Sequence, residues 1–203
     1  DEILVVCGPG NNGGDGLAIA RLLIKEKFNV HVILIGEKFS TDNKINQERL
    51  ANAGIKLADI SDYKNLYGKA DFIIDALLGS GITRTAEGSL KPHIDLINQS
   101  PAKKISIDLP SGMSDVFPIE SGSVVKADHT LTFHLPKLPF FMYDSGPFAG
   151  EVSVLDIGLM DSAFEGEKPL AHLLTKEMVK ANFPIRNKFS HKGSFGHTLI
   201  IAG

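Results

Sequence analysis

Three short apolar runs, each followed by a glycine-containing loop, constrain the fold of this chain most strongly. The runs are residues 3–7, 71–78 and 104–109, and the loops are residues 8–16, 79–85 and 108–114. A short continuous apolar run is typical of a strand buried on both faces, as in a parallel sheet. Because ligands bind outside the carboxyl ends of the strands in open α/β sheets, we expect the three loops to form one site at one edge.

Amphipathic helical patterns and further strands lie between these runs. Apolar residues recur at steps of three and four from Asp15 onward, and residues 41–52 follow a Ser/Thr cap and end before Gly54. Further helices are predicted at 64–67, 90–98 and 175–182, and further strands at 30–35, 55–57, 130–133, 152–157 and 198–202. This alternation predicts an α/β protein, a Rossmann-like three-layer αβα sandwich with a mostly parallel sheet.

A change in composition near residue 161 predicts a domain boundary. The segment 161–169 is polar and contains Gly166 and Pro169, which is typical of a linker. The strand predicted at 198–202 has no helix after it, so it leaves a βα unit incomplete. We therefore expect a first domain over residues 1–162, and a linker with the opening segment of a second domain over residues 163–203.

Composition excludes several classes of protein. The 203 residues carry a net charge of −3, which excludes a strongly basic nucleic-acid surface. A single cysteine excludes a disulfide framework, and the seven histidines show no metal-ligand spacing. No apolar run approaches the ~18 residues of a membrane span, and no signal-peptide pattern opens the chain. We expect a cytoplasmic protein with a small-molecule ligand and neither a nucleic-acid nor a membrane partner.

The first glycine loop matches a dinucleotide fingerprint only in part. Residues 8–13 satisfy G-x-G-x-x-G after a strand and before a helix, and Glu37 stands where a ribose-binding acid is expected. With the helix beginning at Asp15, however, a carboxylate would occupy the place of the pyrophosphate, and a second anion would be repelled. The alternative interpretation is that Asp15 is only the N-cap of that helix.

Two further carboxylates lie in or at the end of apolar runs. Asp75 is inside the run 71–78, and Asp108 follows Ile105-Ser106-Ile107 near the end of the run 104–109. A buried carboxylate is costly unless it is paired or binds a cation. Alternatively, Asp75 caps a neighbouring helix and Asp108 ties down its own turn as an Asx motif. Asn12, Asp75 and Ser111 together offer only oxygen ligands with one formal charge, which suits a monovalent cation better than a divalent one.

Two other residues carry a chemical group whose role the pattern leaves open. Cys7 ends the first apolar run and is interpreted as a small buried hydrophobic residue rather than a nucleophile. Lys137 is expected either to be solvated or to reach a ligand phosphate.

Four motifs, in order, resemble those of one known family. Residues 10–16 followed by Ala20-Arg21-Leu22, then 75–81, 108–112, and Thr132-Phe133 through Pro136-Lys137, are similar to the motifs of the YjeF N-terminal family, the NAD(P)HX epimerases. The resemblance covers residues 3 to about 160. It implies that the chain interconverts the R and S epimers of NADH and NADPH hydrated at C6, and that it is a homo-oligomer, a dimer or higher.

The resemblance also implies roles for individual residues. Asp108 would be the acid/base at the hydrated ring and a further contact to the substrate. The other substrate contacts would come from the first loop, and the phosphates would be held by backbone N–H groups of the second (Asn11, Asn12, Gly13, Gly14, Asp15; Gly79, Ser80, Gly81, Ile82, Thr83, Arg84, Thr85). A potassium ion would be held by Asn12, Asp75 and Ser111.

Both ends of the sequence depart from the pattern of the YjeF N-terminal family. Residues 188–196 and 199–203 resemble the opening of a ribokinase-like, nucleotide-dependent NAD(P)HX dehydratase domain. This implies a bifunctional parent protein, in which ADP or ATP serves only the missing dehydratase part. Family members also carry helices before the first strand, whereas this sequence begins at that strand.

Two rival functions fit the same fold. A nicotinamide-dependent oxidoreductase would reuse the first loop and Glu37, but the acid-bearing loop at residues 11–15 disfavours it. A non-enzymatic scaffold for protein or RNA partners is known among relatives of the family, although Asp108 and the Asn/Asp loop are intact here.

Overall fold

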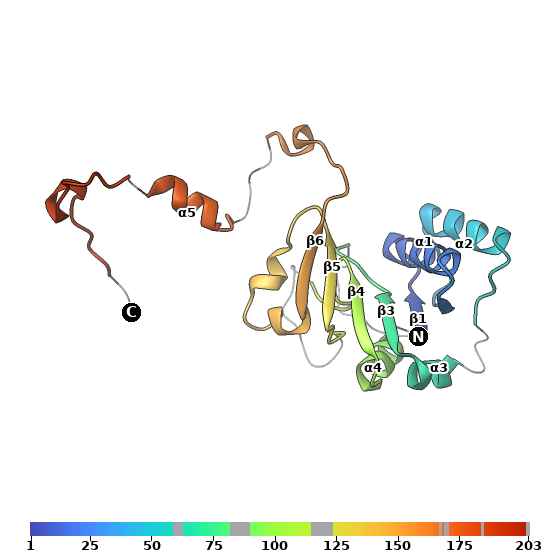
Figure 1. The fold of residues 1–203 in the computed structure, drawn as a ribbon. Helices are drawn as coiled ribbons and strands as arrows, with labels where there is room; N and C mark the ends of the chain where they lie inside the picture. Colours follow the sequence, from blue (N-terminus) through green and yellow to red (C-terminus); the bar gives the residue numbers. More distant parts are fainter. Residues whose placement is uncertain are drawn as a thin grey trace. The chain divides into compact units, whose positions relative to one another are not determined.

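A single sheet of six parallel strands, in the order β2-β1-β3-β4-β5-β6, organises the first part of the chain (Figure 1). The strands are β1 (Glu2–Cys7), β2 (Asn29–Leu34), β3 (Phe72–Ala76), β4 (Lys103–Ile107), β5 (His129–Phe133) and β6 (Glu151–Leu155). The predicted mostly parallel sheet is thereby confirmed. All six carboxyl ends point to the same edge, because every neighbouring pair is parallel.

The computed structural model describes residues 1–58, 63–81, 90–114, 124–166, 168, 171–183 and 185–201. Contacts divide the chain into two units, Asp1–Ala163 and Phe164–Gly203. The helices are α1 (Asn11–Lys25), α2 (Thr41–Asn52), α3 (Tyr63–Lys69), α4 (Lys91–Gln99) and α5 (Lys176–Asn182), with short 3₁₀ turns η1 (Leu138–Phe141), η2 (Gly146–Phe148), η3 (Asp161–Phe164) and η4 (Lys192–Phe195). None of the helices within these described ranges has the length and apolar character that crossing a bilayer requires.

Helices cover both faces of the sheet, because successive side chains of β1 belong to two different apolar clusters. Ile3, Val5 and Cys7 belong to one apolar cluster, which includes residues of α1 and α2. Leu4 and Val6 belong to the other, which includes residues of α3 and α4. Successive side chains of a strand point to opposite faces, so both faces of β1 are buried and its continuous apolar sequence is explained. The helices α1 and α2 pack against each other (Figure 1).

The start of α1 differs from the prediction. The helix begins at Asn11 rather than at Asp15, and its N-cap is Gly10 in an extended conformation. The four residues before Asp15 include Gly13 and Gly14, whose low helix propensity hid the first turn. By contrast, α2 has the predicted bounds, and Ser40 caps it by accepting a hydrogen bond from the Asn43 amide.

Two predicted strands are not formed. Residues 55–57 form no ladder, and among the described residues one backbone hydrogen bond, from the Ala58 amide to the Val32 carbonyl, joins this segment to β2. Residues 198–201 are not a strand either, and 202–203 lie outside the described residues. A strand needs a hydrogen-bonded neighbour, which apolar composition alone does not supply. In this second unit, α5 is capped by the Thr175 hydroxyl.

Candidate functional site

A cavity of about 620 Å³ lies at the carboxyl ends of the strands. Its lining comes from segments that follow β1, β2, β3 and β4 and from the last residue of β5, which places it where an open α/β sheet binds ligands. The lining residues are Pro9, Gly10, Asn11, Asn12, Asp15, Ser40, Leu77, Leu78, Gly79, Ser80, Gly81, Asp108 and Phe133. The structure therefore brings together described parts of the three loops. Ile82, Thr83, Arg84 and Thr85 of the second loop lie outside the described residues.

Close backbone packing explains the glycines of the first loop. A Cβ atom on Gly8 would lie 1.8 Å from the Leu77 carbonyl oxygen, and one on Gly13 would lie 1.9 Å from the Gly8 carbonyl oxygen. Both distances are far below van der Waals contact, so only glycine fits. The loop is thereby pressed against the end of β3, and the spacing that resembles a dinucleotide fingerprint serves this packing.

Asn43 of α2 fixes the same loop, and the sequence analysis did not single it out. Its side chain is fully buried, and its Nδ2 atom donates to the Gly8 carbonyl at 2.8 Å and to the Gly10 carbonyl at 3.1 Å. Its Oδ1 atom accepts a hydrogen bond from Gln47. An asparagine early in a helix looks like an ordinary surface residue, so nothing in the sequence marks this role.

Asp15 lines the cavity but is not at the helix start. It is the fifth residue of α1, whose first turn contains no acidic residue. Both predictions that placed it there, as the N-cap and as a carboxylate occupying an anion site, are therefore wrong. Burial raises the pKa of the Asp15 carboxyl, and the negative charges of Asp108 and Asp42 raise it further.

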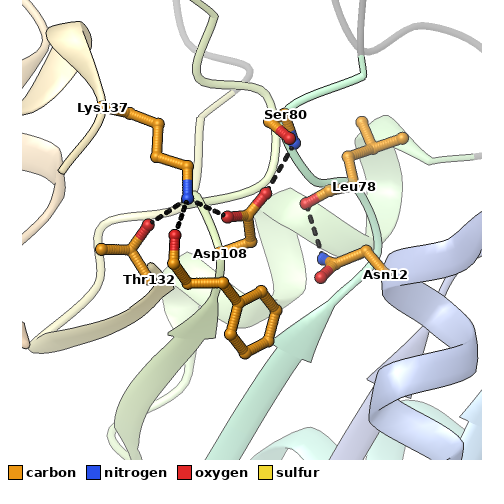
Figure 2. Close-up of polar contacts among 7 residues, drawn as sticks. Asn12, Leu78, Ser80, Asp108, Thr132 and Lys137 are labelled. Atoms are coloured by element: carbon orange, nitrogen blue, oxygen red, sulfur yellow. Dashed lines mark hydrogen bonds and ion pairs between the residues drawn. The ribbon is translucent and has the colours of Figure 1, made fainter. Parts of the chain in front are cut away.

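Asp108 projects from the end of β4 and is held at both oxygens (Figure 2). Its Oδ1 atom lies 2.7 Å from Lys137 Nζ, and its Oδ2 atom accepts a hydrogen bond from the Ser80 amide at 3.0 Å. The Asx interpretation is not supported, because these partners lie outside its own turn. Burial by itself would raise the pKa of the Asp108 carboxyl, but the hydrogen bond and charge of Lys137, aided by Ser80, outweigh burial and hold the pKa below its usual value.

The sequence analysis expected Lys137 either to be solvated or to reach a ligand phosphate. In the structure its ammonium group instead contacts three protein groups. Besides Asp108, its ammonium group donates to Thr132 Oγ1 and to the Phe133 carbonyl, both at 2.8 Å (Figure 2). The side chain is about one-fifth exposed. The position of this lysine, five residues after a buried threonine at the end of β5, was the available signal for its role.

Asp75 and Ser111 are in direct contact in the core of the site. The Asp75 carboxylate accepts hydrogen bonds from the hydroxyl and amide of Ser111, the hydroxyl of Ser106 and the amide of Leu77. None of these donors is at a helix start, so the helix-cap interpretation of Asp75 is wrong. Burial nevertheless raises the pKa of the carboxyl, and its four hydrogen bonds only oppose that effect.

Asn12 supplies an unpaired oxygen next to this pair. Its Nδ2 atom donates to the Leu78 carbonyl at 2.9 Å, and the Leu78 amide in turn donates to Ser111 Oγ at 2.9 Å. Its Oδ1 atom is buried and has no hydrogen-bond partner among the described residues. A buried carbonyl oxygen without a donor, linked through Leu78 and Ser111 to a buried carboxylate, fits a monovalent ion with oxygen ligands.

The remaining predicted residues are outside the site's polar network. Glu37 is exposed and does not line the cavity, which removes the ribose-binding acid of the oxidoreductase alternative. Cys7 is fully buried, which raises the pKa of its thiol and agrees with its interpretation as a hydrophobic residue. The described parts of the chain contain no group of three or more His, Cys, Asp or Glu residues that could hold a metal ion.

Comparisons with known proteins identify several relatives. The family model described as YjeF-related protein N-terminus matches residues 1–139. The chain is 36% identical over 207 residues to the bifunctional NAD(P)H-hydrate repair enzyme Nnr of Thermofilum pendens, covering 98% of this chain and 38% of that protein. It is 36% identical over 166 residues to the NAD(P)H-hydrate epimerase of Oenococcus oeni, covering 79% of this chain and 76% of that protein.

A solved structure agrees with the fold. The crystal structure of the yeast protein ynu0 matches with a TM-score of 0.60 and 22% identity, over 68% of this chain and 59% of that one. At this identity the match supports the fold alone. The chain spans about two-fifths of the length of the bifunctional relatives it matches.

Proposed function

Since the chain belongs to the family of YjeF-related protein N-termini, we propose that it is an NAD(P)H-hydrate epimerase that interconverts the R and S forms of hydrated NADH and NADPH. The observation that supports this proposal most directly is the Asp108 carboxylate, which lines a cavity at the strand ends and is held in its charged form by Lys137. A positioned carboxylate is suited to proton transfer at the hydrated ring.

The charge of Asp108 favours epimerisation by opening of the hydrated ring over epimerisation by loss of the hydroxyl group. Removal of the proton from the C6 hydroxyl by an ionised Asp108 lets the electron pair form a C6 carbonyl while the bond from C6 to the ring nitrogen breaks. The nitrogen keeps the bonding pair, and its attack on the opposite face of the carbonyl closes the ring with inverted configuration. The hydroxyl oxygen then recovers the proton from Asp108. The alternative, loss of the hydroxyl, requires a proton donor at the start, and a carboxyl with a lowered pKa is a poor donor.

Substrate contacts are proposed for the two glycine loops. Asn11, Asn12 and Asp15 line the cavity, and Gly13 and Gly14 lie between Asn12 and Asp15 in the first turn of α1. The Ser80 amide already donates to Asp108, so phosphate binding by the second loop would depend on its other amides. In this arrangement one loop both binds the dinucleotide and orients the base.

A potassium ion is proposed as the resident cation. Asn12, Asp75 and Ser111 would hold it, because the unpaired Asn12 oxygen belongs to a side chain that is linked through Leu78 and Ser111 to the buried Asp75 carboxylate. When bound, the ion would supply positive charge next to Asp75. Asn12 and Ser111 would orient the segment after β3, which carries the Ser80 amide to Asp108.

Two proposals concern the parent protein. Bifunctional relatives align with the whole length of the chain, which supports the interpretation of residues 163–203 as a linker and the opening of a nucleotide-dependent dehydratase domain. The ADP or ATP would bind only there. A homo-oligomer is supported by the edge strand β6, whose Val154 and Leu155 side chains are exposed. Light scattering of the purified chain tests the second proposal.

The decisive experiment measures conversion of purified R-NADHX to the S form. A coupled S-specific dehydratase would follow the product in the presence of potassium, and the Asp108→Asn variant would serve as the control, because the epimers also interconvert unaided. We expect the wild-type chain to exceed this control by about 10²- to 10⁴-fold. Equal rates for the two proteins would refute the proposed role of Asp108.

A further inference from the structure

We propose that Lys137 is the positioning residue of this site, which holds the Asp108 carboxylate both in orientation and in charge and is itself held by the end of β5. The inference rests on the proposed function for its kinetic consequences, but not for its structural ones. The sequence analysis expected this lysine only to be solvated or to contact a phosphate.

The hydrogen bonds of the ammonium group show that it acts through Asp108. An ammonium group has three N–H donors, and here the three acceptors are Asp108 Oδ1 at 2.7 Å, Thr132 Oγ1 at 2.8 Å and the Phe133 carbonyl at 2.8 Å (Figure 2). No N–H group remains for a substrate. Lys137 therefore cannot donate to a ligand without releasing one of these partners, and its effect on the reaction passes through the carboxylate.

The sheet fixes both members of the ion pair. The Asp108 amide donates to the Leu131 carbonyl of β5 at 2.8 Å, and Thr132, the next residue of β5, is fully buried. Asp108 itself has a φ angle of 67°, a left-handed conformation that turns the chain out of β4. Since the neighbouring strand ends hold the aspartate backbone and the lysine head, the 2.7 Å contact is built into the fold.

The surrounding charges make the lysine necessary. The charged groups that face Asp108 are Lys137 from the segment after β5 and the Asp15 carboxylate from α1, while Asp75 of β3 is enclosed by its own hydrogen bonds. Within the described ranges no other cationic side chain contacts Asp108, and Arg84 lies outside them. Without Lys137, a carboxylate on a side chain that is only 10% exposed would face a second carboxylate and favour its protonated form.

The first test compares Lys137→Met with Lys126→Met. Methionine keeps the length of the side chain and removes its charge, and Lys126 is an exposed lysine before β5, at the opposite edge of the sheet. For Lys137→Met we expect kcat to fall roughly 10- to 100-fold while KM changes less than about threefold, and the acid limb of the pH profile to move to higher pH. Lys126→Met is expected to match the wild-type protein. An unchanged pH profile in Lys137→Met would overturn the proposal.

A second pair of variants keeps the test valid if Lys137→Met does not fold. Thr132→Val removes one of the three acceptors of Lys137 with little change in volume, and Thr132→Ser restores the hydroxyl. We expect Thr132→Val to move kcat and the acid limb in the same direction as Lys137→Met, but less, and Thr132→Ser to recover both. Equal behaviour of valine and serine would count against the proposal.

A readout independent of activity separates this inference from the proposed function. NMR titration of the Asp108 carboxyl carbon, in the wild-type chain and in each variant, reports its protonation directly. A higher midpoint in Lys137→Met and Thr132→Val supports the positioning role, even if the wild-type chain shows no epimerase activity and the proposed function fails. Epimerase activity in the wild type with the same Asp108 midpoint in all variants would refute the positioning role and leave the function standing.

Discussion

Replacing Asn43 by alanine is expected to loosen the first glycine loop at a measurable cost in stability. The Asn43 amide is the side-chain donor to the carbonyls of Gly8 and Gly10, and the bond to Gly8 is buried. A buried acceptor that loses its donor costs about 1–3 kcal/mol, whereas the Gly10 carbonyl keeps the hydrogen bond from the Gly14 amide. We therefore expect the free energy of unfolding to fall by about 1–3 kcal/mol.

The assay for this variant is urea unfolding followed by circular dichroism, because the chain contains no tryptophan. Asn52→Ala, at an exposed position at the end of the same helix, is the matched control and should change the free energy by less than about 0.5 kcal/mol. If epimerase activity is present, Asn43→Ala should also raise KM, because the loop lines the cavity. Equal stability of the two variants would show that the hydrogen bonds from Asn43 to the first loop contribute nothing, and the reasoning would be refuted.

Three further predictions follow from the site. Gly13→Ala places a Cβ 1.9 Å from the Gly8 carbonyl oxygen and should lower the free energy of unfolding in urea by about 1–3 kcal/mol. Gly68→Ala, at an exposed position of α3 with open space around it, should raise that free energy by about 0.5–1 kcal/mol, and the same sign for both variants would contradict the packing argument. The Asp15 carboxyl has a raised pKa, so its contribution to stability is present below its unfolded value of 3.8 and is lost as pH rises through its folded pKa. Asp15→Asn should therefore raise Tm at pH 8 relative to wild type, with the gain disappearing toward pH 4, and a constant Tm difference across this range would refute it. Potassium chloride should raise Tm of the wild-type chain above its value in choline chloride at equal ionic strength but should not do so for Asn12→Ala, and equal values in the wild type would argue against the cation site.

The sheet could be predicted from the sequence because its strands are buried on both faces. A continuous apolar run such as 71–78 is stable only where both of its faces are buried. The glycines that follow it mark the edge of the sheet at which the loops lie. The start of α1 could not be predicted in the same way. Its first turn is built from asparagines and glycines, and it forms because the close contacts of Gly8 and Gly13 leave no other path, which is a property of tertiary packing.

The candidate site was predictable in its residues more than in its connections. The position of Asp108 at the end of an apolar run marks it as unusual, since a carboxylate there must find a partner. That partner is Lys137, which lies 29 positions further along the chain. It follows His134, whose left-handed φ of 62° helps to turn the chain back toward the sheet. Side-chain hydrogen bonds between distant segments leave no periodic signal in a sequence, so the contact of Lys137 with Asp108 and the role of Asn43 were recognised only in the structure.

The network around Asp108 explains why three strands are needed to place one carboxylate. One oxygen is bound through Lys137 to the end of β5, and the other is bound by the Ser80 amide, which belongs to the loop after β3. That loop is in turn connected to Asn12 of α1 through the Leu78 carbonyl. A displacement of any of these segments would rotate the carboxylate or release one of its oxygens. The proposed cation between Asn12 and Asp75 and the proposed positioning role of Lys137 therefore act on the same group from opposite sides, and their removal should be less than additive in its effect on kcat.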